Sequence, residues 1–232
     1  MRLTLRLRRC AENAHNEDIP RYQCPCGITR PTGRANGRRI NFKNRIRSDK
    51  ETGYLKSYPI KKNILITGLP SVGKTTLIKK LSKELKHLHP AGFYTEEIRE
   101  EGQRKGFELI SLDGKRGLLS HIHIKSPHRV GKYKVDIEAF ENLLDEIPFF
   151  SPSTHLIVID EIGKMECLSD RFKNLLKKIF NSGKLVIATI ALKGGGLIGE
   201  VKERRDIKLF EMTSQNRDTL LLEILKRLEK VL

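Results

Sequence analysis

The sequence predicts an α/β fold in which a mostly parallel sheet carries helices on both faces. From about residue 63 onward, short apolar runs rich in β-branched residues alternate with segments whose apolar residues recur at helical spacing. The runs at 64–67 and 155–159 are apolar almost throughout, which is typical of strands covered on both sides. A sheet with one face in water would instead alternate apolar and polar residues.

Each predicted element has its own evidence in the sequence. Pro90 ends the first helix, and Asp136 and Ser169 stand where helix N-caps are expected. The pair Asp113-Gly114 predicts a turn between two strands. In chain order we expect strands at 64–67, 92–95, 107–112, 118–122, 155–159, 185–190 and 207–212, and helices at 77–88, 137–147, 172–179 and 220–231.

A phosphate-binding loop is predicted between the first strand and the first helix. Its two glycines allow the backbone to curl, so that successive N–H groups and the helix N-terminus together form an anion site. Lys74 would reach the β- and γ-phosphates of a nucleotide, and the Thr75 hydroxyl would coordinate Mg²⁺. The residues of this segment expected to bind nucleotide are Gly68, Leu69, Pro70, Ser71, Val72, Gly73, Lys74, Thr75 and Thr76.

Two acidic residues follow the apolar run at 155–159. Asp160 and Glu161 stand at the carboxyl end of that predicted strand, where open α/β sheets place groups that contact ligands. Asp160 would bind Mg²⁺, directly or through water, and so contribute to nucleotide binding. Glu161 is placed to orient or deprotonate a water that attacks the γ-phosphate. An aspartate alone suits a kinase or a hydrolase, and the additional glutamate favours hydrolysis.

Four further segments accompany the loop in a fixed order: Gly92-Phe93-Tyr94-Thr95-Glu96-Glu97-Ile98-Arg99, Gly106-Phe107-Glu108, Arg129-Val130-Gly131-Lys132-Tyr133 and Asp160-Glu161-Ile162-Gly163-Lys164-Met165-Glu166. With the loop, they resemble the nucleoside-triphosphatase family described from thermophiles, which has a human cancer-related member. The resemblance runs from about Ile64 to the C-terminus. It implies a P-loop NTPase fold and Mg²⁺-dependent hydrolysis of ATP, GTP, CTP and UTP or TTP to diphosphate and phosphate.

By matching position, the resemblance assigns Lys74 and Thr75 to phosphate and metal binding and Glu161 to catalysis. The chain departs from the family pattern at Ser71, where many members have glycine, and at Cys167, where leucine is usual.

An arginine that stabilises the transition-state charge is expected in such a site. Arg129 is the favoured candidate, because it lies in the family-like Arg-Val-Gly-Lys-Tyr stretch, and we expect it to be catalytic together with Lys74 and Glu161. Arg99, Arg104 and Arg204 are alternatives. Any single surface arginine is more often a solvated residue than a catalytic one.

Positive charge is concentrated at the start of the chain. Of the net charge of +17, residues 1–62 carry +11 and residues 63–232 carry +6. The first segment has 11 Arg and 5 Lys without sustained apolar periodicity, whereas the remainder has 9 Arg and 20 Lys. We therefore expect a disordered basic extension at 1–58, followed by a P-loop nucleoside-triphosphatase domain at 59–232.

Other interpretations of the extension stay open. It could be upstream sequence translated from a misplaced start codon, a basic arm that holds nucleic acid, or a transit peptide. A small metal site built from Cys10, His15, Cys24 and Cys26 is a further alternative, although the Cys-Pro-Cys spacing is unusual for one.

Composition bounds the cellular setting. Four cysteines without a disulfide framework suit a reducing compartment, and no apolar run approaches the ~20 residues that span a bilayer. We expect a cytoplasmic protein without a membrane partner, and a monomer is favoured.

The sequence thus predicts an enzyme that hydrolyses nucleoside triphosphates with Mg²⁺ and a broad base preference. Two other functions stay open. A kinase that phosphorylates a nucleotide, nucleoside or polynucleotide would use the same loop and the same aspartate. A nucleic-acid-binding protein whose affinity is switched by nucleotide would use the basic extension.

Overall fold

The computed structural model describes residues 61–231 of the chain. By its internal contacts the chain divides into two units, Met1–Leu55 and Lys56–Leu232, and all described residues belong to the second. The predicted extension, its boundary at residue 58 and the candidate metal ligands between Cys10 and Cys26 lie outside the described residues. Of the helices described, none combines the length and the apolar composition needed to cross a membrane.

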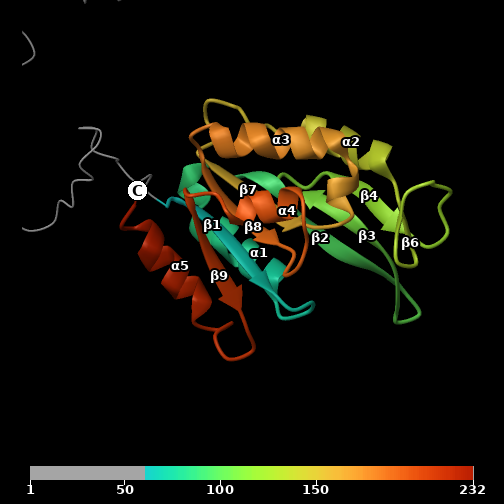
Figure 1. The fold of residues 1–232 in the computed structure, drawn as a ribbon, viewed down its shortest axis with the longest axis horizontal. Coiled ribbons are helices and arrows are strands. Elements are labelled where there is room, and N and C mark those ends of the chain that lie inside the picture. The colour runs from blue at the N-terminus through green and yellow to red at the C-terminus, as the bar shows by residue number, and fades with distance from the viewer. Residues whose placement is uncertain (1–60, 232) are drawn as a thin grey trace, which may run out of the picture. The chain divides into compact units, whose positions relative to one another are not determined.

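The described residues form a nine-stranded sheet with helices on both faces (Figure 1). The strand order is β5-β6-β4-β3-β2-β7-β8-β1-β9. The strands are β1 (Asn63–Gly68), β2 (Ala91–Glu100), β3 (Gln103–Ser111), β4 (Arg116–His121), β5 (Arg129–Val130), β6 (Tyr133–Val135), β7 (Leu156–Ile162), β8 (Leu185–Ile190) and β9 (Ile207–Met212). The helices are α1 (Lys74–Glu84), η1 (Lys86–Leu88), α2 (Ile137–Glu146), η2 (Glu166–Leu168), α3 (Asp170–Asn181), α4 (Leu197–Lys202) and α5 (Leu220–Leu228).

The strands β2, β7, β8, β1 and β9 pair in parallel and form the part of the sheet that carries the site. Every residue of β1 and β8 is buried, as their largely apolar sequences predict. The prediction of an α/β fold with a mostly parallel sheet and helices on both faces is confirmed.

Antiparallel strands extend the sheet beyond β2. The predicted hairpin around Asp113-Gly114 is present as β3 and β4. A second hairpin was not predicted: β2 continues to Glu100 and turns back into β3 at Glu101-Gly102, both of which have positive φ. The second half of β2 is largely polar and partly exposed, so it lacks the apolar run by which the other strands were found.

Two apolar layers enclose the sheet. On one face, α1 and α5 pack over β7, β8, β1 and β9, with Leu81 and Ile224 fully buried. On the other face, α2 and α3 contribute Phe140 and Phe172, whose ring centroids lie 5.2 Å apart. Figure 1 shows these helix pairs on opposite sides of the sheet. The short helix α4, which was not predicted, adds Ile198 to the α3 side.

The predicted N-caps of α2 and α3 are confirmed. The Asp136 carboxylate accepts a hydrogen bond from the Ala139 amide at 3.0 Å, and the Ser169 hydroxyl accepts one from the Phe172 amide at 2.9 Å. The predicted helix at 77–88 is shorter than expected, because α1 ends at Glu84 and a 3₁₀ turn, η1, follows it.

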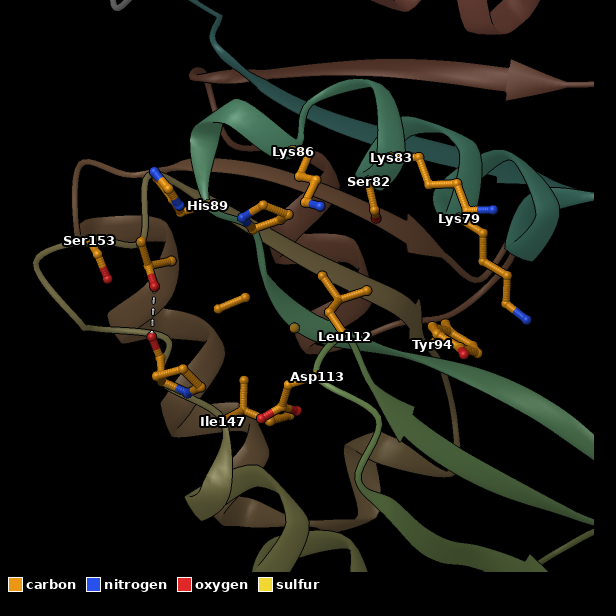
Figure 2. A pocket seen from close by; sticks show the side chains of 15 residues that line it. Lys79, Ser82, Lys83, Lys86, His89, Tyr94, Leu112, Asp113, Ile147 and Ser153 are labelled. Atoms are coloured by element: carbon orange, nitrogen blue, oxygen red, sulfur yellow. Dashed lines mark hydrogen bonds between the residues drawn. The ribbon is translucent and has the colours of Figure 1, made fainter.

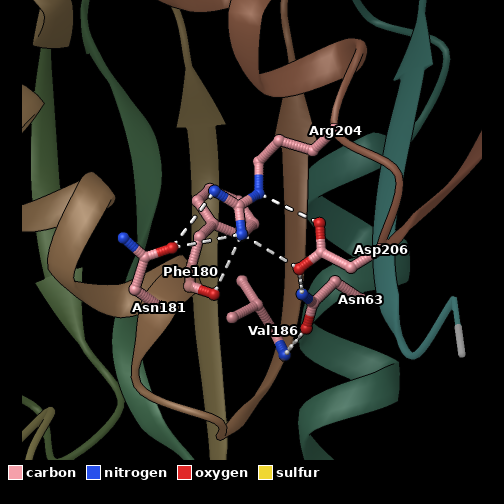
Figure 3. A network of polar contacts seen from close by, with 6 residues as sticks. All are labelled: Asn63, Phe180, Asn181, Val186, Arg204 and Asp206. Atoms are coloured by element: carbon pink, nitrogen blue, oxygen red, sulfur yellow. Dashed lines mark hydrogen bonds and ion pairs between the residues drawn. The ribbon is translucent and has the colours of Figure 1, made fainter. Parts of the chain in front are cut away.

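A polar network fixes the end of the sheet at which β1 and β9 begin (Figure 3). Arg204 makes two hydrogen bonds of 3.0 Å to the Asp206 carboxylate, which also accepts from the Asn63 amide at 2.9 Å. The Asn63 side chain is fully buried, and its carbonyl oxygen accepts a hydrogen bond from the Val186 backbone amide at 3.1 Å. Arg204 also donates to the Phe180 carbonyl, so the network joins α3, β8, β1 and β9.

Candidate active site

The loop between β1 and α1 has the backbone geometry of a phosphate-binding loop. Gly73, the N-cap of α1, has φ of 111°, and Ser71 has φ of 62°. Gly68 must be glycine for a different reason, because a Cβ there would lie 2.4 Å from the Met212 carbonyl oxygen of the neighbouring strand. The loop therefore curls as its two glycines predict. The left-handed conformation of Ser71 is also the reason a glycine would suit that position.

Lys74 lies across its own loop. Its ammonium donates hydrogen bonds of 3.0 Å to the carbonyl oxygens of Gly68 and Leu69. These acceptors hold the Lys74 ammonium against the loop, next to the N-terminus of α1, where free backbone N–H groups favour an anion. Phosphate oxygens are stronger acceptors for an ammonium than neutral carbonyls, so a nucleotide can replace these contacts without moving the helix.

Asp160 is a buried carboxylate at the carboxyl end of β7, with 2% of its surface exposed. The Thr189 hydroxyl of β8 donates to one carboxylate oxygen at 3.0 Å, and the Thr95 hydroxyl of β2 donates to the other at 3.2 Å. Two neighbouring strands thus orient the Asp160 carboxylate. Each carboxylate oxygen retains further acceptor capacity.

Glu161 occupies a strained backbone position next to Asp160. Its φ is 93°, a value that residues with a side chain rarely adopt, and the register between β7 and β8 shifts between Ile159 and Ile162. This irregularity turns Glu161 to the exposed side of the strand, between the buried residues Asp160 and Ile162. Backbone strain of this kind is concentrated at functional sites.

A family model described as NTPase matches residues 63–225 of the chain, the segment that contains the loop, Asp160 and Glu161. The chain belongs to this NTPase family. The resemblance inferred from the loop and the four accompanying segments is thereby confirmed.

Two relatives are similar to this chain over most of its length. Nucleoside-triphosphatase THEP1 of Thermotoga sp. (strain RQ2) is 48% identical over 167 residues, which are 72% of this chain and 95% of the relative. The human cancer-related nucleoside-triphosphatase is 39% identical over 181 residues, covering 70% of this chain and 94% of the human protein.

Two solved structures of the NTPase family share the fold. The crystal structure of THEP1 from the hyperthermophile Aquifex aeolicus has a TM-score of 0.63 and 38% identity, over 72% of this chain and 99% of that chain. The solution structure of a human cancer-related nucleoside triphosphatase has a TM-score of 0.64 and 37% identity, over 73% of this chain and 98% of that chain.

A further acidic residue, Glu166, lies beside the predicted site and was not assigned a role from the sequence. Its side chain is buried. A Cβ placed on Gly163 would lie 2.9 Å from a carboxyl oxygen of Glu161 and 2.9 Å from one of Glu166, so both carboxyl groups lie against the same glycine. The sequence around Glu166 resembles an ordinary helix start, so nothing in the residue spacing indicates that this glutamate is buried.

The electrostatics of these acids depend on burial and on one another. Although Glu161 as a whole residue is exposed, its carboxyl lies against Gly163 and is partly desolvated there. This desolvation and the nearby charge of Asp160 raise the pKa of Glu161, and Lys74 partly offsets the effect. Burial, followed by the charge of Glu161, raises the pKa of Glu166 to about 8. Glu166 is therefore protonated at neutral pH, while a raised pKa makes Glu161 a stronger base than an ordinary glutamate.

The structure does not bring the predicted arginines to the loop. Arg129 lies on β5, separated from β1 by six strands in the sheet order, and it donates to the Gly131 carbonyl of its own turn. Arg104 and Arg99 both contact Glu97 on the hairpin of β2 and β3. Arg204 lies at the opposite end of β1 in the network of Figure 3. The expected catalytic role of Arg129 therefore has no support in this arrangement.

The donor set at the loop fits Mg²⁺. Thr75 is the second residue of α1, and Asp160 supplies a carboxylate that is fixed by two threonines. Hydroxyl and carboxylate oxygens are the ligands that Mg²⁺ prefers, with water and phosphate oxygens completing its shell.

Proposed function

We propose that this protein hydrolyses nucleoside 5′-triphosphates to diphosphate and phosphate, with Mg²⁺ and with a broad base preference. The relatives at 39–48% identity named above are nucleoside-triphosphatases, and the chain covers at least 94% of their length. Support for the same activity in this chain comes from Lys74, Asp160 and Glu161, which lie at the carboxyl ends of the parallel strands β1 and β7.

The observation that carries the proposal is the position of Glu161. It has a strained backbone, it is exposed as a whole residue, and it is adjacent to the buried, hydrogen-bonded Asp160. The positive charge of Lys74 acts on its carboxyl. A kinase needs no residue that activates water, because its acceptor is a hydroxyl or phosphate group of the substrate. A second carboxylate with a raised pKa suits the orientation and deprotonation of an attacking water.

The loop supplies binding and charge stabilisation. Its amides and the Lys74 ammonium would hold the β- and γ-phosphates, and they would neutralise the charge that develops during in-line attack. Bound Mg²⁺, held by Thr75 and Asp160, would supply further positive charge at the phosphates. The groups that the loop provides meet phosphates, which all nucleoside triphosphates share, and this supports a broad base preference.

Two substitutions test the division of roles. Glu161→Gln should lower the turnover rate by about 10²–10⁴-fold while nucleotide affinity stays within a few-fold of the wild type. Lys74→Ala should weaken nucleotide binding and turnover together, because it removes the charge on the phosphates. Calorimetric binding of a non-hydrolysable ATP analogue, combined with phosphate release from ATP, GTP, CTP and UTP, separates the two outcomes.

An unchanged turnover rate in Glu161→Gln would refute the assigned base. Phosphate transfer to an added nucleotide, nucleoside or RNA end that outpaces release to water would show that the chain is a kinase instead.

A further inference from the structure

A groove of about 820 Å³ runs along α1 on the side that faces β2 (Figure 2). One wall is formed by the later turns of α1 and by η1, and the other by the turn after β3 and the segment around Ile147-Pro148. Ala91 and Gly92 of β2 contribute to its lining. The lining residues include none from the loop at 68–76, and neither Asp160 nor Glu161, so this is a second concavity.

The α1 wall of this groove is basic. Lys79, Lys83, Lys86 and His89 line it, and Asp113 across the groove is the sole acidic residue in the lining. The Asp113 carboxylate already accepts a hydrogen bond from the Ser111 hydroxyl. Neither Lys83 nor Lys86 forms an ion pair with any residue that the structure describes. We call this feature the lysine groove.

The lysine groove also offers apolar and aromatic surface. Tyr94 lies at the end of the groove nearest Lys79, whose ammonium is 3.9 Å from the centre of the tyrosine ring and 2.5 Å from the Glu96 carboxylate. Leu112, Ile147 and Pro148 contribute apolar atoms to the facing wall. Figure 2 shows the three lysines along α1 and η1, with Leu112, Tyr94 and Asp113 across from them.

Lys79 and Lys83 are four residues apart on α1, so they lie on the same face of the helix with about 5–6 Å between their Cβ atoms. An ammonium on a flexible stem binds phosphate as a point charge, without the fixed geometry that an arginine imposes. A volume of this size accommodates a small organic ligand, for which pockets are typically about 300–1,000 Å³. Cations on one wall and apolar atoms on the other suit a ligand that carries phosphate on an apolar body.

We propose that the lysine groove binds a small organic phosphate of the size of a nucleoside monophosphate, at a site separate from the loop. The phosphate would contact Lys83 and Lys86, which form no ion pair within residues 61–231. The organic part would lie against Leu112 and Pro148.

Calorimetry on the full chain tests this site, with AMP, CMP, inorganic phosphate and adenosine as probes at low ionic strength. Three variants are compared: Lys83→Glu/Lys86→Glu in the groove, Lys74→Ala in the loop, and the matched control Lys177→Glu/Lys178→Glu, a pair of exposed lysines on α3. The groove variant should bind AMP and CMP at least tenfold more weakly than the wild type. The α3 control should bind them within twofold, and Lys74→Ala should retain the groove-dependent binding.

Four results would overturn the proposal: no binding of either monophosphate, equal loss in the groove variant and the α3 control, equal binding of adenosine and AMP, or dependence on Lys74 alone. Groove-dependent binding of a single-stranded oligonucleotide without binding of a monophosphate would also overturn it, and would assign the groove to nucleic acid. Phosphate release from ATP is measured on the same proteins. If the wild-type protein releases no phosphate from ATP, the proposed function is refuted, but the binding result for the groove still stands.

Discussion

The buried carboxyl of Glu166 links stability to pH at the scale of a single residue. Because burial and neighbouring acids raise its folded pKa to about 8, this group binds a proton in the folded state that it loses near its ordinary pKa when unfolded. Its contribution to stability is therefore complete below the unfolded pKa and is lost as the pH rises to about 8, by at most about 1.4 kcal/mol per pH unit.

Glu166→Gln should flatten this dependence, because the amide has a similar shape and does not ionise. Urea unfolding at pH 6 and pH 8.5 should show a smaller loss of stability in Glu166→Gln than in the wild type. Glu138→Gln, an exposed position on α2, serves as the control and should retain the wild-type slope. An identical slope in Glu166→Gln and the wild type would mean that Glu166 is ionised in the folded protein.

The residues of the site differ in how far the sequence predicts them. Lys74, Thr75 and Asp160 are predictable because the loop and the end of a parallel strand have a known relation to phosphate and metal. Arg129 was chosen from a motif, and the sheet order, which the motif does not contain, places it far along the sheet. Burial of Glu166 depends on tertiary packing, which leaves no local pattern.

At the scale of elements, the caps of α2 and α3 are testable. Asp136→Ala should destabilise the protein by about 1 kcal/mol, the usual cost of removing an N-cap. Ser169→Ala should cost more, because the Ser169 hydroxyl is buried and also donates to Glu141 of α2 at 2.6 Å. Thermal unfolding of both variants, with the exposed Ser214→Ala as control, measures the difference. A smaller effect in Ser169→Ala than in Asp136→Ala would contradict the role of the Glu141 contact.

Elements with strong apolar periodicity were predicted, and those without it were missed. The strands β1, β7 and β8 and the helices α1, α2, α3 and α5 bury a continuous run or stripe. By contrast, β5 and β6 have two and three residues, and α4 has six residues behind a run of glycines, so their sequences are too short to show a period. The polar half of β2 is held by its pairing with β3 rather than by its own burial.

At the scale of the whole molecule, the network of Arg204, Asp206 and Asn63 ties the sheet to α3 at the end remote from the loop. Asn63→Ala would leave the Val186 amide without its acceptor and the Asp206 carboxylate short of one donor. We expect a loss of about 2–4 kcal/mol, since each buried polar group left unpaired costs about 1–3 kcal/mol.

Because the network lies at the opposite end of β1, the turnover rate per folded molecule should not change in Asn63→Ala. Chemical denaturation and phosphate release, with the exposed Asn174→Ala as control, measure both quantities. A lower rate in fully folded Asn63→Ala would show that the two ends of the sheet are coupled. The alternation of strands and helices indicated the layered architecture, but this long-range network joins residues more than 140 positions apart and was not predictable from local sequence.

The left-handed backbone at position 161 creates a trade-off between catalytic activity and thermal stability. A residue with a side chain loses about 1–2 kcal/mol of folding free energy in this conformation, and glycine does not. Glu161→Gly should therefore melt at a higher temperature while it loses turnover. Differential scanning calorimetry beside a phosphate-release assay measures the two effects, and a lower melting temperature would contradict the strain. A screen of random variants for heat resistance alone would therefore select Glu161→Gly, which is inactive. Each surviving clone would also have to be assayed for hydrolysis.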